Sequence, residues 1–134
     1  MMASPRGGAG RVTAIAVATF AFVAAAPGTA GAASCEWALR FATEIVDNAQ
    51  RAITAEDFVV ARRATSDTRT IAIDTAREAK GCGCPAAIPF LEQVAQQAMY
   101  SLNAQNITAA QQYGTKIMEY GDATLEALRQ CPGT

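Results

Sequence analysis

The sequence contains no histidine, and this absence excludes several kinds of functional site. A Ser-His-Asp or Cys-His catalytic centre, an imidazole metal ligand and a c-type haem attachment site all require that residue. No Gly-rich phosphate-binding loop follows a strand either, because no segment alternates apolar and polar residues for long. We therefore expect no catalytic residues, no metal site and no cofactor.

A strong charge of either sign is also missing, with eleven Lys and Arg against twelve Asp and Glu. Two of the bases, Arg6 and Arg11, lie near the start, so the rest of the chain carries nine bases, twelve acids and a net charge of −3. A mildly acidic surface is unfavourable for binding nucleic acid or an anionic membrane. We expect neither as a partner.

Residues 1–33 have the composition of a secretory signal peptide. The two arginines supply positive charge, residues 12–26 are uncharged and mostly apolar, and Ala-Gly-Ala at 30–32 resembles a cleavage signal. The apolar run is shorter than the roughly 20 residues that a spanning helix needs, and no later segment resembles one. We expect cleavage after Ala32 or Ala33, which leaves one domain, residues 34–134, in the periplasm or the extracellular space.

The four cysteines follow this segment, and their spacing divides the domain into two units. Cys35 and Cys82 are 47 positions apart, as are Cys84 and Cys131, so units 35–82 and 84–131 lie end to end. An even count in an exported chain predicts two disulfides, and the equal spacing favours one within each unit. Two other pairings remain open: Cys35–Cys84 with Cys82–Cys131, and Cys35–Cys131 with Cys82–Cys84.

Apolar residues recur every three or four positions in both units, which predicts an all-α fold. We expect a small four-helix domain built from two disulfide-stapled helical hairpins. Thr54 is the expected N-cap of the second helix, with Asp57 three residues later, and Asn103 with Asn106 repeat this junction 49 positions on. The third helix is expected to begin at Pro85 or Pro89.

These caps make the second arm of each hairpin about ten residues longer than the first. The excess is about 15 Å of helix at about 1.5 Å per residue, whereas bridged Cα atoms lie about 5.5 Å apart. We therefore expect a bend or break in the longer arm, at 65–68 or 114–115, where β-branched residues and a glycine lower helix propensity.

The segment Cys82-Gly83-Cys84 before Pro85 is the one stretch with reactive chemistry available. A close dithiol at a helix start has a route to a lowered thiolate pKa, which would suit disulfide exchange or a soft metal such as Cu(I). A thiol redox or copper-binding protein is therefore an alternative function. Because Cys35 and Cys131 supply partners at the repeat spacing, we favour structural disulfides.

An uncharged face for a partner is predicted on the third helix, where Gln93, Gln96, Gln97 and Tyr100 fall three and four positions apart. Amides and phenols suit a protein interface. Trp37 is expected to pack over the disulfide at Cys35. We expect a non-catalytic binding protein, such as an inhibitor, an immunity-type protein or a small chaperone, with another protein as partner. A carrier of a small apolar ligand is a second alternative.

Overall fold

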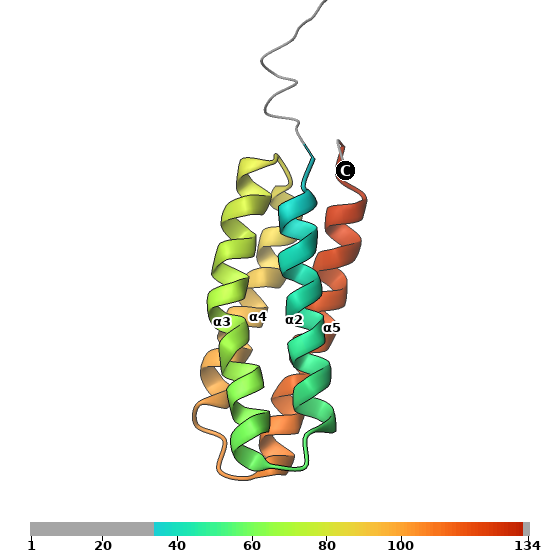
Figure 1. Ribbon diagram of the computed structural model, residues 1–134. Helices are drawn as coiled ribbons and strands as arrows, with labels where there is room; N and C mark the ends of the chain where they lie inside the picture. The colour runs from blue at the N-terminus through green and yellow to red at the C-terminus, as the bar shows by residue number, and fades with distance from the viewer. Residues whose placement is uncertain (1–33, 133–134) are drawn as a thin grey trace, which may run out of the picture. The chain divides into compact units, whose positions relative to one another are not determined.

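The computed structural model describes residues 34–132, and in this range the chain forms a bundle of helices (Figure 1). In chain order they are α2 (Glu36–Thr54), α3 (Phe58–Gly81), the short 3-10 turn η2 (Pro85–Ala87), α4 (Ile88–Ser101) and α5 (Ile107–Arg129). The described residues contain no strand, so the all-α prediction is confirmed. The predicted signal peptide lies outside the described residues.

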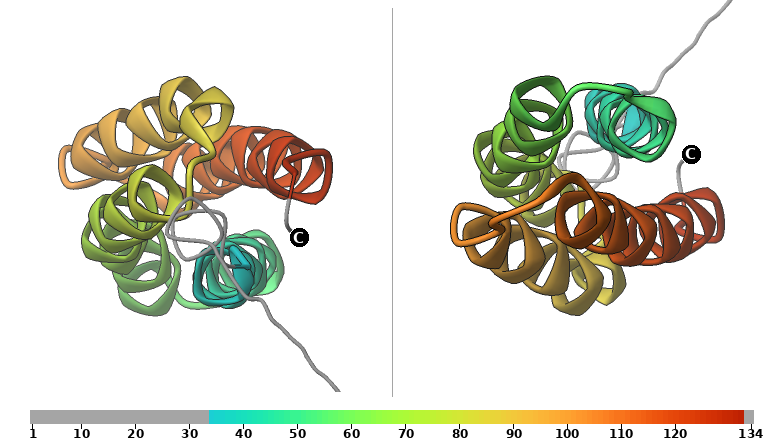
Figure 2. Two further views of the ribbon diagram at one scale, coloured as in Figure 1. Left: turned by 90° about the horizontal axis from the view of Figure 1, so that it is seen from above. Right: turned by 90° about the horizontal axis from the view of Figure 1, so that it is seen from below.

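Successive helices run in opposite directions, and each packs against its neighbours around a common core (Figure 2). α2 contacts α3 and α5, α4 contacts the same two helices, and α3 and α5 also meet. The start of α2, the end of α5 and the connection from α3 to α4 lie at one end of the bundle (Figure 1). The open ends of both hairpins are therefore at that end.

The buried residues repeat between the two hairpins. Every buried residue of the first hairpin except Ala64 has a buried residue 49 positions later in the second. The second hairpin has the larger residue at some positions, with Leu91 for Ala42, Ile117 for Thr68 and Leu128 for Ala79. It has the smaller residue at others, with Gly114 for Thr65, Gly121 for Ala72 and Val94 for Ile45. Since a core is packed to nearly constant density, small side chains of one hairpin complement large ones of the other.

Two glycines let α5 approach α2 closely. A Cβ atom on Gly121 would lie 3.0 Å from Val46 Cγ2 and 3.2 Å from Ile45 Cγ2. A Cβ on Gly114 would lie 3.1 Å from the Cβ of Ala52. These separations are shorter than ordinary van der Waals contact. The absence of a side chain at these two positions therefore allows the short distance between the axes of α2 and α5.

The helix caps differ from the prediction. The Asp57 carboxylate accepts the Val60 N–H at 3.0 Å, and the Asn106 side chain accepts the Ala109 N–H at 2.8 Å. Thr54 is instead the last residue of α2, and Asn103 lies in the loop after α4. The prediction of Thr54 and Asn103 as caps is wrong, because Thr54 still belongs to α2, where its hydroxyl donates to the Gln50 carbonyl, and the next helices begin only after Asp57 and Asn106.

The disulfides join Cys35 to Cys82 and Cys84 to Cys131, with Cα–Cα distances of 5.3 and 5.8 Å, and this confirms the favoured pairing. In the first hairpin α2 has 19 residues and α3 has 24, so the second arm is longer by five residues rather than about ten. In the second hairpin α5 has 23 residues and α4 has 14, and the three residues of η2 extend the shorter arm. The difference arises because each long helix begins after the later cap. No break is needed at 65–68 or 114–115, and both helices run through these positions.

The start of the third predicted helix involves both prolines. Pro85 opens η2, and Pro89 is the second residue of α4. Both positions suit proline, because the first turn of a helix leaves its N–H groups without intrahelical partners. Gly83, between the two disulfides, has a φ of 80°, a left-handed conformation that favours glycine.

Candidate functional site

The predicted partner face lies on α4, but its four residues do not share one environment. Gln96 and Tyr100 are exposed, whereas Gln93 and Gln97 are half-buried. Gln93 and Gln96 border a hollow that α4 shares with α3, and Gln97 and Tyr100 are not part of its lining. The structure therefore places two of the predicted residues beside a concave surface and two next to it on the same helix.

This concave surface, which we call the α3–α4 groove, runs along the outside of the bundle between the two helices. It consists of a hollow of about 430 Å³ and a smaller one of about 70 Å³ that share Ile73, Glu92 and Ala95. The lining residues are Arg69, Ala72, Ile73, Ala76, Leu91, Glu92, Gln93, Ala95, Gln96 and Met99. Arg69 and Glu92 are the only charged residues in this lining.

Large apolar side chains are exposed along the groove and beyond one end of it. Ile73 and Met99 are each 45% exposed within the groove. Val59 and Leu102 are 62% and 52% exposed and together line a further hollow between the start of α3 and the end of α4. Because exposed apolar side chains that gather in one concavity mark interaction surfaces, this side of the bundle is the strongest candidate site.

These apolar residues were not predicted from the sequence. Ile73 follows the core residue Ala72 and Met99 follows the core residue Ala98, so each lies about 100° around its helix from a buried position. Leu39, Val46 and Met118 also follow buried residues, yet they pack against the core. The spacing therefore does not separate the groove residues from residues at the edge of the core.

The cysteines form no dithiol site, since the structure has no free cysteine among the described residues. Cys82 and Cys84 are each bonded to a different partner, and Cys35 and Cys84 are buried. Exchange requires an attacking thiolate to reach a sulfur, and the other half of each bridge, Cys82 or Cys131, is half-buried. This arrangement favours the structural reading of the cysteines over the redox or copper-binding one.

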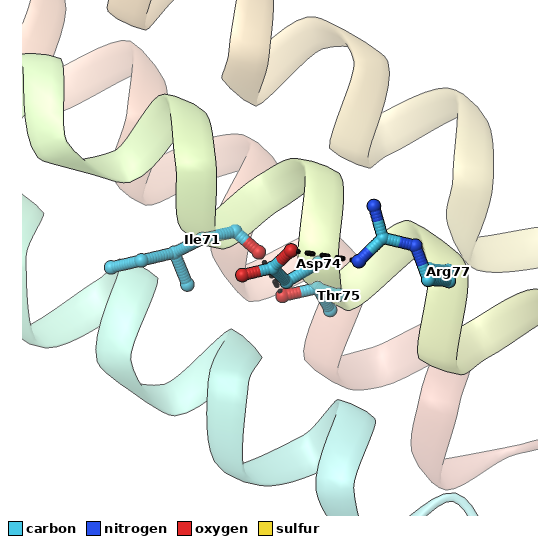
Figure 3. Close-up of polar contacts among 4 residues, drawn as sticks. All are labelled: Ile71, Asp74, Thr75 and Arg77. Atoms are coloured by element: carbon cyan, nitrogen blue, oxygen red, sulfur yellow. Dashed lines mark hydrogen bonds and ion pairs between the residues drawn. The ribbon is translucent and has the colours of Figure 1, made fainter.

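The charged side chains lie on outer faces. On α3 the Arg77 guanidinium pairs with the Asp74 carboxylate at 3.0 Å, while the neighbouring Thr75 hydroxyl donates to the Ile71 carbonyl at 2.6 Å (Figure 3). Another ion pair among the described residues, Arg40–Glu36 at 3.4 Å, is also exposed. Such pairs contribute little to stability. Within residues 34–132, no three Cys, Asp or Glu side chains gather in a way that would hold a metal ion.

Two residues have surroundings that the sequence did not predict. Trp37 is 57% exposed rather than buried, with its ring 6.0 Å from that of Phe41 and 5.0 Å from the Arg40 guanidinium carbon. The Gln111 amide donates to the carbonyls of Ile53 and Ala55, at 3.1 and 3.0 Å. Gln111 thus joins the second hairpin to the end of α2, across more than fifty positions of sequence.

Among the described residues, no helix has the length and apolar character needed to cross a membrane. Comparison with models of known protein families, with curated protein sequences and with solved structures finds no match to this chain.

Proposed function

We propose that this chain is a non-catalytic, exported binding protein whose partner, another protein, docks in the α3–α4 groove. The observation that carries the proposal is the exposure of Ile73 and Met99 within a concave surface between two helices. The two disulfides are consistent with export, because such bonds persist in oxidising compartments.

The groove suits an amphipathic helical segment of the partner. Its floor is made of small side chains, Ala72, Ala76 and Ala95, which let another backbone come close. Two larger apolar side chains, Ile73 and Met99, would flank the incoming helix. Binding a helix by its apolar face in a groove of this kind is a recurring mode of recognition. The amides of Gln93 and Gln96 would remain at the rim, where they can bond to polar groups of the partner.

The redox and carrier alternatives have less support. A redox or copper site at Cys82-Gly83-Cys84 would require prior reduction of both bridges. A carrier would require an enclosed apolar cavity, whereas the hollows described above lie at the surface and the core consists largely of alanine and threonine. The groove, by contrast, is already open at the surface.

The test is capture of a partner from envelope extract with residues 34–134, followed by affinity measurements on substituted proteins. Ile73→Glu and Met99→Glu should each weaken binding by about tenfold or more, because a carboxylate would be desolvated without a partner. Trp37→Glu is the matched control, since it changes an exposed apolar residue on α2. Equal affinity of all three variants and the parent protein would reject the groove.

Tyr100→Ala extends this test to the rest of the predicted face. If the contact continues around α4, this variant should lose more than about 1 kcal/mol of binding free energy while the helical circular dichroism stays unchanged. Normal binding by Tyr100→Ala together with weak binding by Ile73→Glu would confine the interface to the groove.

A further inference from the structure

Another hollow is lined by residues of α2 and of the first turns of α3. These turns lie at the end of the bundle away from the start of α2 and the end of α5 (Figure 1). The hollow has a volume of about 280 Å³ and is lined by Arg51, Val59, Val60, Arg63, Ala64 and Asp67. Val59 and Val60 are 62% and 47% exposed, so the hollow has an apolar wall that faces solvent. The sequence analysis assigned no role to these residues.

The internal repeat shows what fills the corresponding place in the second hairpin. Ala64 is the one buried residue of the first hairpin without a buried residue 49 positions later, and the residue found there is Tyr113. Tyr113 is half-buried and packs against a small cluster that contains Ala104 and Ala110. The second hairpin therefore covers this position with its own aromatic ring, whereas the first hairpin has only a methyl group there.

The rim of the hollow is cationic on balance. Arg63 forms no ion pair with any residue in the range 34–132, although Asp67 lies one turn further along α3. The Arg51 guanidinium donates to the neutral side-chain oxygen of Asn48 and so keeps its charge uncompensated. Two cations and one carboxylate surround an apolar wall. This arrangement favours a ligand that has an apolar group with a negative charge beside that group.

We infer that this hollow receives an aromatic side chain of a partner polypeptide, with acidic residues on either side of that aromatic residue. The volume fits one ring, since it exceeds the ~150 Å³ that holds benzene and lies just below the range of about 300–1,000 Å³ typical of sites for drug-sized ligands. The ring would lie over Val59, Val60 and Ala64, and the carboxylates would face the two arginines. The inference does not depend on the α3–α4 groove.

The direct test is a titration of ¹⁵N-labelled residues 34–134 with the peptide acetyl-Glu-Phe-Glu-amide, followed by amide chemical shifts. We expect the largest changes at Arg51 and from Val59 to Asp67. Acetyl-Glu-Ala-Glu-amide removes the ring, and acetyl-Lys-Phe-Lys-amide reverses the charge, so each should bind more weakly by about tenfold. Equal binding of either control, no binding of the first peptide, or shifts centred on Ile73 and Gln96 would overturn the inference.

Two substitutions in the protein test the hollow itself. Ala64→Tyr should close the hollow as Tyr113 does in the other hairpin, and should weaken peptide binding about tenfold. Arg63→Glu changes only an exposed side chain, so it should retain the fold and weaken binding of the acidic peptide by a similar factor. Unchanged peptide affinity in Arg63→Glu, or in a folded Ala64→Tyr variant, would contradict the proposed site.

Discussion

At the scale of single residues, the bundle depends on side chains that are small or absent. Gly114 and Gly121 on α5 face α2 at separations that leave no room for a methyl group without movement of Ala52, Ile53, Ile45 or Val46. Glycine in a helix interior costs about 1 kcal/mol relative to alanine. The packing gained by the close approach of α2 and α5 must therefore stabilise the protein by more than this cost.

Gly121→Leu should destabilise the protein by about 1–3 kcal/mol, because the added side chain would meet Ile45 and Val46 and force α2 away. Chemical denaturation would measure the loss. Gly81→Ala is the matched control, since no atom lies within 4 Å of its added methyl group. That variant should be neutral or more stable by up to about 1 kcal/mol. A Gly121→Leu variant as stable as the parent would show that α2 and α5 are free to separate.

At the scale of helices, both hairpin junctions have the same design, in which a short polar side chain at an equivalent position begins the long arm. Asp57 and Asn106 each accept the N–H three residues later, and they are 49 positions apart. Thr54 makes a different bond, from its hydroxyl to the Gln50 carbonyl at 2.9 Å, within the helix that it ends.

Asp57→Ala and Asn106→Ala should each lower the free energy of unfolding by about 1 kcal/mol, because one N–H group at a helix start loses its acceptor. Thr54→Ala and Asn103→Ala should change it by less than about 0.5 kcal/mol, since these residues cap no helix. Thermal or urea unfolding of the four variants would compare them. Larger losses for Thr54→Ala and Asn103→Ala than for the other pair would reverse the assignment.

The junctions also show what sequence reasoning can supply and where it ends. The repeat and the cysteine spacing predicted two hairpins and the correct disulfides, because helix periodicity and cysteine spacing can both be read directly from the sequence. Each junction, however, contains two good cap residues, Thr54 with Asp57 and Asn103 with Asn106. The choice between them depends on where the first arm ends, because Thr54 already belongs to α2 and its hydroxyl bonds to the Gln50 carbonyl.

The candidate site was only partly predictable for the same reason. The polar spacing of Gln93, Gln96, Gln97 and Tyr100 identified α4, but which of these residues border a hollow depends on how closely α3 lies. Ile73 and Met99 follow core residues, as Val46 and Met118 do, and only the structure shows that the first two are exposed. The repeat offset pairs Ala64 with Tyr113, but the hollow beside Ala64 becomes visible only in three dimensions.

At the scale of the whole molecule, each hairpin is closed by its own bridge, and both bridges span 47 positions. On the chain-entropy account a loop of this length contributes about 4 kcal/mol, a large share of the stability of a small domain. The two bridges should contribute nearly equally, because the loops are of equal length.

Reduction should therefore lower the melting temperature substantially while the separate helices keep part of their circular dichroism signal. The double variants Cys35→Ala with Cys82→Ala, and Cys84→Ala with Cys131→Ala, should each lose roughly 2–5 kcal/mol. Circular dichroism melts with and without reductant would measure both effects. A melting temperature that reductant does not change would contradict the account by loop length. So would a loss of stability in only one of the two double variants.

The pairing of the cysteines also has a consequence for covalent topology. The domain consists of two closed rings joined only through Gly83, because no bridge crosses from one hairpin to the other. A single cut at this residue would leave two unlinked pieces that remain together through the core and through the hydrogen bonds of Gln111. In denaturant these pieces would separate without any reductant. Their reassociation in buffer would report the affinity of one hairpin for the other, free of the peptide bond that joins them.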